Sequence, residues 1–407
     1  MGSMKTTIGI KQIIIGMAVI SLLAAFVIGR LPKSTSIESY LPDTSDTVCA
    51  YDLAKFEAPS NYLFESLDTA GNTVGYITLT EGRGYGGILL VEIVWSLDGA
   101  ILSITVPEQQ EGNAWWAKLE DHDFFDQYIG RQFDTGLILG DDIDVVSGAT
   151  ISSTGVALGV YQGRALLADE LGESYPAPME IVKFGIGEIL LISGLIMTVL
   201  FRTFAVFRKR KWLRYITLTL GLGVLGFWLS RPLSLTNIVA WLIGSPPNLP
   251  NNLFLYILVL GVVGLVLLTG KNFYCFWLCP FSAVQEVTYR IGGQIGLKPK
   301  PKTYKFLRNI RFLLLWAALM LVFWFTNPSL AVFEPWGTLF SQVGGIDQWL
   351  LLILTITFSF FIFSPWCFYI CPVGAFLDIV IKVRKGGISL WKKLKVFRVK
   401  RLAEDKA

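Results

Sequence analysis

The sequence predicts a polytopic α-helical membrane protein with six spans and one extracytoplasmic α+β domain. Of the 407 residues, 53% are hydrophobic and only 16% are charged, whereas soluble domains carry about 25% charged residues. The charges are also divided by position. Residues 31–180 hold 24 Asp and Glu against 6 Lys and Arg, and the rest of the chain holds 7 against 29. Such a division indicates two compartments.

The first predicted span is residues 8–28. About 20 apolar residues are enough to cross a bilayer. Lys5 and Lys11 flank the start of this run, and no convincing cleavage site follows it. We therefore interpret residues 1–30 as an uncleaved signal anchor.

The remaining spans and their orientation follow from apolar runs and basic loops. Lys and Arg near span ends are retained in the cytoplasm. Residues 202–214, 271–311 and 382–407 hold six, eight and ten basic residues, and the alternate loops hold only Arg231. Both termini should therefore be cytoplasmic, in a multi-pass protein of the cytoplasmic (inner) membrane. The five runs are 184–201, 215–230, 253–270, 311–326 and 348–365; the expected units are an external domain (31–180), a five-span domain (181–381) and a basic tail (382–407).

The external domain shows strand and helix patterns. Alternating residues at 76–79, 88–95 and 101–106, with an Asp98-Gly99 turn, predict strands. A short strand is expected at 144–146 and a helix at 155–171. The hydroxyl-rich run between them either caps that helix or places small residues beside its free N–H groups as an anion site. Its members are Ser147, Gly148, Ala149, Thr150, Ser152 and Ser153.

The membrane half contains two copies of one motif, Cys-x-x-x-Cys-Pro, 92 residues apart. The copies hold Cys275 and Cys279, then Cys367 and Cys371; Glu286 and Asp378 stand seven residues later. On one helix, i and i+4 thiols would point the same way, with the helix bent at the following Pro. Buried apolar packing is one interpretation. In the other interpretation, the four thiolates are soft sulfur ligands for an iron-sulfur cluster or for zinc. Lys271, Arg290 and Lys382 would then compensate the negative charge of the thiolates.

Other residues exclude further classes of site. The single histidine, His122, excludes a bis-histidine cytochrome b. No nucleic-acid partner is expected. Cys49 would lie unpaired in the external domain. Glu188 stands inside the second span, where it either pairs with Lys183 at the interface or accepts a proton from a quinol.

The run from Asp144 through Ser147-Gly148-Ala149-Thr150 to Ser152 resembles the flavinylation motif of the FMN-binding domains found in sodium-translocating NADH:quinone reductases and in Rnf complexes. The resemblance implies FMN joined covalently, as a phosphoester, to Thr150 by an ApbE-type flavin transferase. Gly84 and Tyr85 belong to a Gly-Tyr-Gly-Gly run that resembles another element of that domain. The family's Glu-Thr-Pro-Gly stretch is replaced by residues 108–113, and Trp115 and Trp116 could supply stacking surfaces.

An FMN-binding domain followed by two Cys-x-x-x-Cys-Pro motifs resembles the NosR/NirI family, in the short PceC-like form. The resemblance implies a transmembrane electron-transfer flavoprotein. Electrons would pass between a membrane quinol (menaquinone or ubiquinone) or a cytoplasmic donor and an extracytoplasmic acceptor, such as a terminal reductase or electron carrier. The alternative is a membrane-anchored redox sensor or maturation factor for such a reductase. Membrane lipid is the remaining expected partner.

Overall fold

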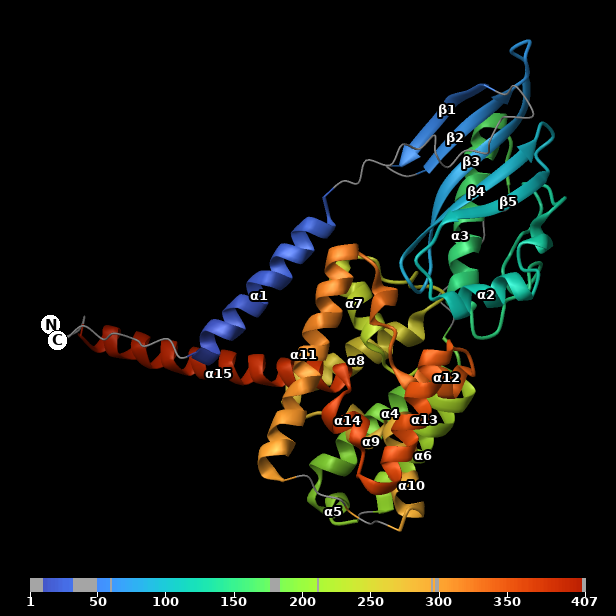
Figure 1. Cartoon of the computed structure of the whole chain (residues 1–407). Coiled ribbons are helices and arrows are strands. Elements are labelled where there is room, and N and C mark those ends of the chain that lie inside the picture. Colours follow the sequence, from blue (N-terminus) through green and yellow to red (C-terminus); the bar gives the residue numbers. More distant parts are fainter. Residues whose placement is uncertain are drawn as a thin grey trace.

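The computed structural model describes residues 10–31, 50–58, 61–175, 184–210, 212–293, 296 and 300–404. An antiparallel sheet with a long helix across it stands at one end of a helical bundle, and α1 (Ile10–Gly29) runs beside that bundle (Figure 1). Helix α1 packs along α11 (Pro301–Phe325), and a Cβ at Gly29 would overlap the carbonyl oxygen of Phe323. Glycine therefore allows the two helices to approach at this point.

The sheet and one helix form the domain nearest the top of Figure 1. Its five strands pair antiparallel in chain order. Helix α3 (Thr150–Leu171) presents glycines at four-residue spacing to the sheet, and a Cβ at Gly159 would overlap Val91. Val91 and Trp95 of the fourth strand are fully buried against this helix. The strands are β1 (Ala50–Ala58), β2 (Asn61–Leu67), β3 (Thr73–Arg83), β4 (Ile88–Ser96) and β5 (Ile101–Glu108).

The strands predicted at 76–79, 88–95 and 101–106 are confirmed in β3, β4 and β5. The strand predicted at 144–146 is wrong. The N–H of Asp144 donates to Gln127 Oε1 at 2.7 Å and that of Val146 to Ser153 Oγ at 3.4 Å, so side chains take the donors that a sheet would need. The helix predicted from residue 155 begins at Thr150 instead, and the hydroxyls of Ser153 and Thr154 donate to the carbonyls four residues earlier, so the hydroxyl-rich run is part of the helix.

Three helices of the described residues are long and apolar enough to cross a membrane: α1, α4 (Ile186–Thr203) and α11. They become four if α12 (Pro335–Ser341) and α13 (Ile346–Phe361), bent by 98°, count as one span. All six predicted spans fall on helices, but three fall on shorter ones, so the count of six stays a prediction. The shorter ones are α6 (Trp212–Gly221) with the π-helix η3 (Leu222–Trp228), α8 (Leu253–Thr269) and α13.

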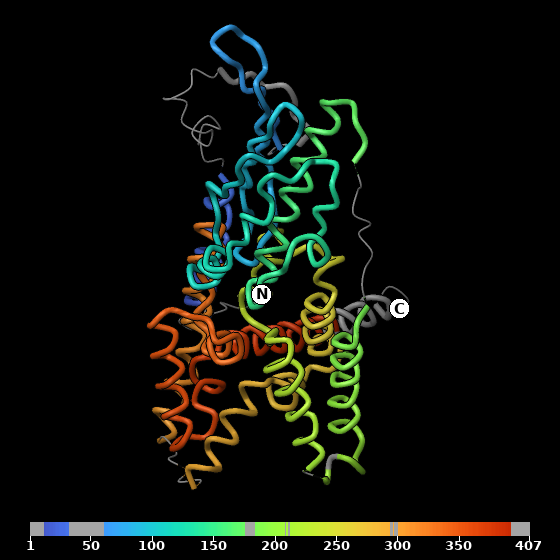
Figure 2. Tube along the Cα trace, turned by 90° about the vertical axis from the view of Figure 1, so that its right-hand side faces the viewer, coloured from blue at the N-terminus to red at the C-terminus, as the bar shows by residue number. Residues whose placement is uncertain are grey.

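The bundle repeats its order of elements, as the 92-residue period predicts. Each copy has a first helix, a connecting segment with a short helix, a second helix, a very short helix with the first Cys, and a helix that begins at Pro. Figure 2 shows α4 and α6 in green and α12 and α13 in orange as separate limbs below the sheet domain. The first copy uses α6, α7 (Leu235–Ile243), α8, α9 (Tyr274–Trp277) and α10 (Pro280–Ile291); the second uses α11, η4 (Pro328–Ala331) with α12, α13, α14 (Pro365–Tyr369) and α15 (Pro372–Glu404).

Candidate functional site

Each Cys-x-x-x-Cys-Pro motif spans a break between two helices. Cys275 lies on α9, whereas Cys279 is the N-cap of α10 with an extended backbone, and Pro280 is the first residue of that helix. Cys367 lies on α14, and Cys371 directly precedes α15. The prediction of one continuous, bent helix is therefore wrong. Proline lacks an N–H and suits the first turn of a helix, so the chain stops and restarts there.

The break in the first copy lies against the centres of two long helices. A Cβ at Gly221, where α6 meets η3, would overlap the carbonyl oxygen of Leu278. A Cβ at Gly194, midway along α4, would lie 3.1 Å from Leu278 Cδ1. The residue before Cys279 is thus buried between two helices, with no exposed surface of its own. Leu278 therefore lies level with the middle of α4.

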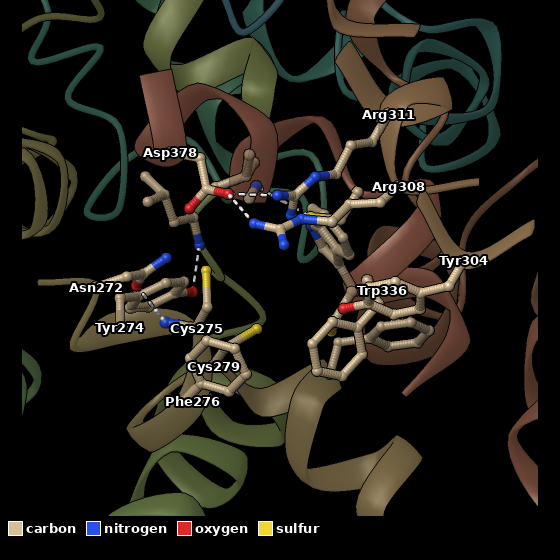
Figure 3. Close-up of a pocket in the computed structure, with 17 residues that line it drawn as sticks. Asn272, Tyr274, Cys275, Phe276, Cys279, Tyr304, Arg308, Arg311, Trp336 and Asp378 are labelled. Carbon is tan, nitrogen blue, oxygen red and sulfur yellow. Dashed lines mark hydrogen bonds and ion pairs between the residues drawn. The ribbon is translucent and has the colours of Figure 1, made fainter. Parts of the chain in front are cut away.

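All four motif cysteines line one cavity of about 190 Å³ (Figure 3), and all four thiols are free. We call it the cysteine cavity. Among the described residues, no three His, Cys, Asp or Glu side chains gather tightly enough to hold a single metal ion. Two thiols from each copy face a shared space, which is the donor set that clusters bound by four cysteines use. The residues present therefore fit an iron-sulfur cluster.

Two N–H groups donate to sulfurs of the second copy. Gln285 Nε2 lies 3.1 Å from Cys367 Sγ, while its Oε1 accepts from the N–H of Trp366 at 3.0 Å. The N–H of Gly374 lies 3.3 Å from Cys371 Sγ. Gln285 is completely buried, so both ends of its amide are fixed by the second motif. Hydrogen bonds donated to the sulfurs are one means by which proteins set the reduction potential of an iron-sulfur cluster.

The cations beside the cavity come from α11. The predicted compensating cations were Lys271, Arg290 and Lys382, and none of these lines the cavity. Arg308 and Arg311 line it instead, and both pair with Asp378, from which Arg308 Nη2 lies 3.8 Å (Figure 3). They were missed because they stand far from either motif in the sequence. The packing of α11 against α15 brings them there.

In the sheet domain, the predicted FMN site lies at the start of α3. Thr150 is the first helical residue, Gly148 has a φ of +85°, and the N-cap is Ala149 without a side-chain cap. The capping interpretation of the hydroxyl run is therefore wrong for Ser147. Asp144 and Ser147 are exposed at an open recess that His122 also lines. Ser152, by contrast, is buried.

Glu111 fixes this region, and the sequence analysis missed it. Its carboxylate accepts from the N–H of Gly86 at 2.6 Å and from the hydroxyl of Ser152. A Cβ at Gly84 would overlap that carboxylate, which explains the glycine there. Glu111 thus ties the Gly-Tyr-Gly-Gly turn between β3 and β4 to the first turn of α3. The available signal was an acidic residue within residues 108–113, where the family pattern changes.

The sheet domain contacts both copies of the bundle through four residues that we call the seam. Tyr85 Oη lies 3.0 Å from Ser234 Oγ in the first copy, and Ser329 Oγ in the second copy donates to the carbonyl of Gln110. Burial raises the pKa of Tyr85 to about 12, so its hydroxyl keeps its proton at neutral pH. Beside the seam, Trp115 Cζ2 lies 3.7 Å from the position of a Cβ at Gly337.

The seam leads directly to the cysteine cavity. Ser234 caps α7, and the N–H of the adjacent Leu233 donates to Tyr274 Oη at 2.8 Å. Tyr274 is buried and precedes Cys275 in the chain, and Leu233 and Tyr274 both line the cavity. The Gly-Tyr-Gly-Gly turn, the seam and the cavity are thereby connected through packed residues.

Two other predicted positions take no part in this arrangement. Glu188 accepts from the N–H of Gly185 at 2.8 Å and caps the first turn of α4. Its expected partner Lys183 lies outside the described residues, as does Cys49. The geometry therefore gives Glu188 a structural role at a helix start.

Comparison with protein families agrees with both sites. A family described as a 4Fe-4S binding domain matches residues 251–298 and 349–390, which contain all four motif cysteines. An FMN-binding domain matches residues 84–164, which contain Thr150. Flavin and iron-sulfur cofactors are supported by these matches together with the thiols of the cysteine cavity.

Individual relatives cover parts of the chain. Uncharacterized protein MJ0750 of Methanocaldococcus jannaschii is 30% identical over 29% of this chain and 51% of its own length. Protein NirI of Paracoccus denitrificans is 30% identical over 40% of this chain and 26% of its own length. Regulatory protein NosR of Pseudomonas aeruginosa is 24% identical over 50% of this chain and 30% of its own length. The chain thus spans about half or less of the length of these relatives. The matches confirm the resemblance to NosR/NirI-type flavoproteins and support a redox electron-transfer role for a membrane protein.

The Gly221→Ala substitution should open the break that holds Cys279. Because the added methyl overlaps the Leu278 carbonyl, we expect the free energy of unfolding to fall by about 1–3 kcal/mol, as overpacking usually costs, with a loss of bound iron. Gly223→Ala is the matched control, since nothing lies within 4 Å of its Cβ position. Thermal unfolding in detergent and iron analysis measure both. Equal melting temperatures for the two variants would contradict the packing argument.

Glu111 should make the stability of the sheet domain depend on pH. Burial raises its pKa above 4.5, while hydrogen bonds from Ser152 and Gly86 oppose the shift. A carboxyl whose pKa is raised by folding stabilises the protein below its unfolded pKa, and this stabilisation is lost as pH rises through the folded pKa. Urea unfolding should therefore show stability falling as pH rises from about 4.5, with a flatter curve for Glu111→Gln. The exposed Glu120→Gln should keep the wild-type slope.

Proposed function

We propose that this protein is a transmembrane electron-transfer flavoprotein. Electrons would pass between a membrane quinol or a cytoplasmic donor and an extracytoplasmic acceptor, such as a terminal reductase. One observation carries the proposal. The Gly-Tyr-Gly-Gly turn, which Glu111 ties to the predicted flavin site, lies at the seam between the sheet domain and the bundle, and the seam adjoins the cysteine cavity. A flavin on the sheet domain and a cluster in the cysteine cavity would thus be connected through residues of one polypeptide.

The division of charge supports the sidedness of this proposal. Residues 31–180 carry the excess of acidic groups, and basic residues concentrate in three of the segments that connect or follow the bundle helices. Lys and Arg resist translocation, whereas acidic residues contribute little to orientation. The proposal therefore places both termini in the cytoplasm and the FMN-binding domain outside, with six spans.

The chain's own residues would have distinct tasks. Thr150 would carry the FMN as a phosphoester formed by an ApbE-type transferase, and Glu111 would hold the surrounding turn. Cys275, Cys279, Cys367 and Cys371 would hold the cluster away from water. When bound, FMN exchanges one or two electrons and a cluster exchanges one. Tyr85 and Ser234 would keep the sheet domain seated on the bundle.

Flavin attachment tests the first half of the proposal. After co-expression with an ApbE-type transferase, the denatured wild-type chain should retain yellow, fluorescent flavin in a gel, and Thr150→Ala should have none. Thr154→Ala is the matched control, because Thr154 lies one turn further along the same helix and its hydroxyl bonds the Thr150 carbonyl at 2.8 Å. A colourless wild-type chain, or flavin on Thr150→Ala, would refute covalent attachment at this residue.

The second half of the proposal, that the sheet domain lies outside the cell and the basic loops lie in the cytoplasm, is tested by thiol labelling. In a Cys49→Ser background, His122→Cys and Lys209→Cys each place one exposed thiol on the sheet domain or after α4. A membrane-impermeant maleimide should label His122→Cys in intact cells, and should label Lys209→Cys only after permeabilisation. The background chain without a new thiol is the control for the four motif cysteines. Labelling of both variants from the same side would end the proposal of electron transfer across the membrane.

A further inference from the structure

We infer that Arg311 raises the reduction potential of the centre held in the cysteine cavity. This inference rests on the proposed iron-sulfur site. The Arg311 side chain is 7% exposed, lines the cavity, and gives one guanidinium nitrogen to Asp378. Its Nε is buried without a hydrogen-bond partner in the described part of the chain. A buried cation with an unused donor therefore stands in the wall of the cavity.

Gly374 stands beside both Arg311 and the sulfur of Cys371. A Cβ on Gly374 would lie 3.7 Å from Arg311 Nη1 and 3.7 Å from Cys371 Sγ. The guanidinium and the thiol therefore flank the same small space. The N–H of Gly374 also donates to Cys371 Sγ. Figure 3 shows Arg311 reaching from α11 towards Asp378 across the cavity from Cys279.

The first copy of the motif shows what a purely structural arginine looks like. Arg214 binds Glu286 through two nitrogens, at 3.0 and 2.7 Å, and its Nε donates to the carbonyl of Phe276 at 2.9 Å. All three nitrogens of that guanidinium donate a hydrogen bond, and Arg214 does not line the cavity. Arg214–Glu286 and Arg311–Asp378 involve the equivalent carboxylates of the two copies. Only the second pair lines the cavity, and together with Arg308, which also pairs with Asp378, it carries one net positive charge beside the thiols.

The direction of the effect follows from electrostatics. Adding an electron makes a centre more negative, and a nearby buried cation stabilises that state because the local dielectric is low. Asp378 opposes Arg311, but its side chain is 27% exposed and is therefore better screened by solvent. Gln285 and Gly374 act in the same direction as Arg311 through their N–H groups on Cys367 and Cys371.

A potentiometric titration followed by electron paramagnetic resonance tests the inference on full-length protein. Arg311→Gln should lower the midpoint potential by at least the equivalent of tenfold in the equilibrium constant, which is about 59 mV for one electron. Arg311→Lys keeps the charge and should recover most of that loss. Asp378→Asn removes the opposing charge and should shift the potential upward.

Arg214→Gln is the matched control, because it breaks the equivalent ion pair away from the cavity. Its potential should equal the wild-type value at equal iron and acid-labile sulfide content. An unchanged potential in Arg311→Gln with full iron content, or an equal shift in Arg214→Gln, would overturn the inference. If Arg311→Gln does not fold, the upward shift in Asp378→Asn still decides. Stoichiometric zinc, or iron that survives Cys275→Ser, would instead overturn the proposed cluster itself.

Discussion

The break in the chain before Pro280 and again before Pro372 is the constraint on which the cysteine cavity depends. If the helix continued through either motif, both thiols of a pair would lie on one helical face. Stopping the helix after the first Cys and restarting it after the second turns Cys279 into an N-cap and sets Leu278 between α4 and α6. The glycines at 194 and 221 are the other half of this constraint, because any larger residue at 221 would overlap the Leu278 carbonyl.

The seam converts that local geometry into a relation between two domains. Ser234 and Ser329 stand in the related Pro-Leu-Ser-Leu and Pro-Ser-Leu runs of the two copies, and each binds one loop of the sheet domain. The sheet domain therefore lies across both copies, as Figure 2 shows. Glu334 adds a buried link between the copies, since its carboxylate accepts from the N–H of Leu235 at 2.9 Å. These contacts hold the sheet domain on both halves of the bundle.

Features set by neighbouring residues or by a repeat could be predicted from the sequence, whereas contacts between residues far apart in the chain could not. Alternation predicted β3, β4 and β5, and the 92-residue period predicted that four thiols share one site. The 144–146 segment misled because its apolar residues mimic a strand while Gln127 and Ser153 take its N–H groups. Arg311 was missed because its closeness to Cys371 comes from the packing of α11 on α15. Glu111 was missed because its partners, Gly86 and Ser152, lie 25 and 41 residues away.

Repetition and divergence assign different tasks to the two copies. Two equivalent motifs supply four equivalent thiols, which a shared centre requires. The first copy connects outward, because Ser234, Leu233 and Tyr274 run from the seam to Cys275. The polarising groups stand beside the thiols of the second copy, because Gln285 donates to Cys367 Sγ, and Gly374 and Arg311 lie beside Cys371. Gln285 belongs to the first copy by sequence yet serves the second, and this exchange binds the copies into one site. A centre between them would then face a connection on one side and a concentration of positive charge on the other.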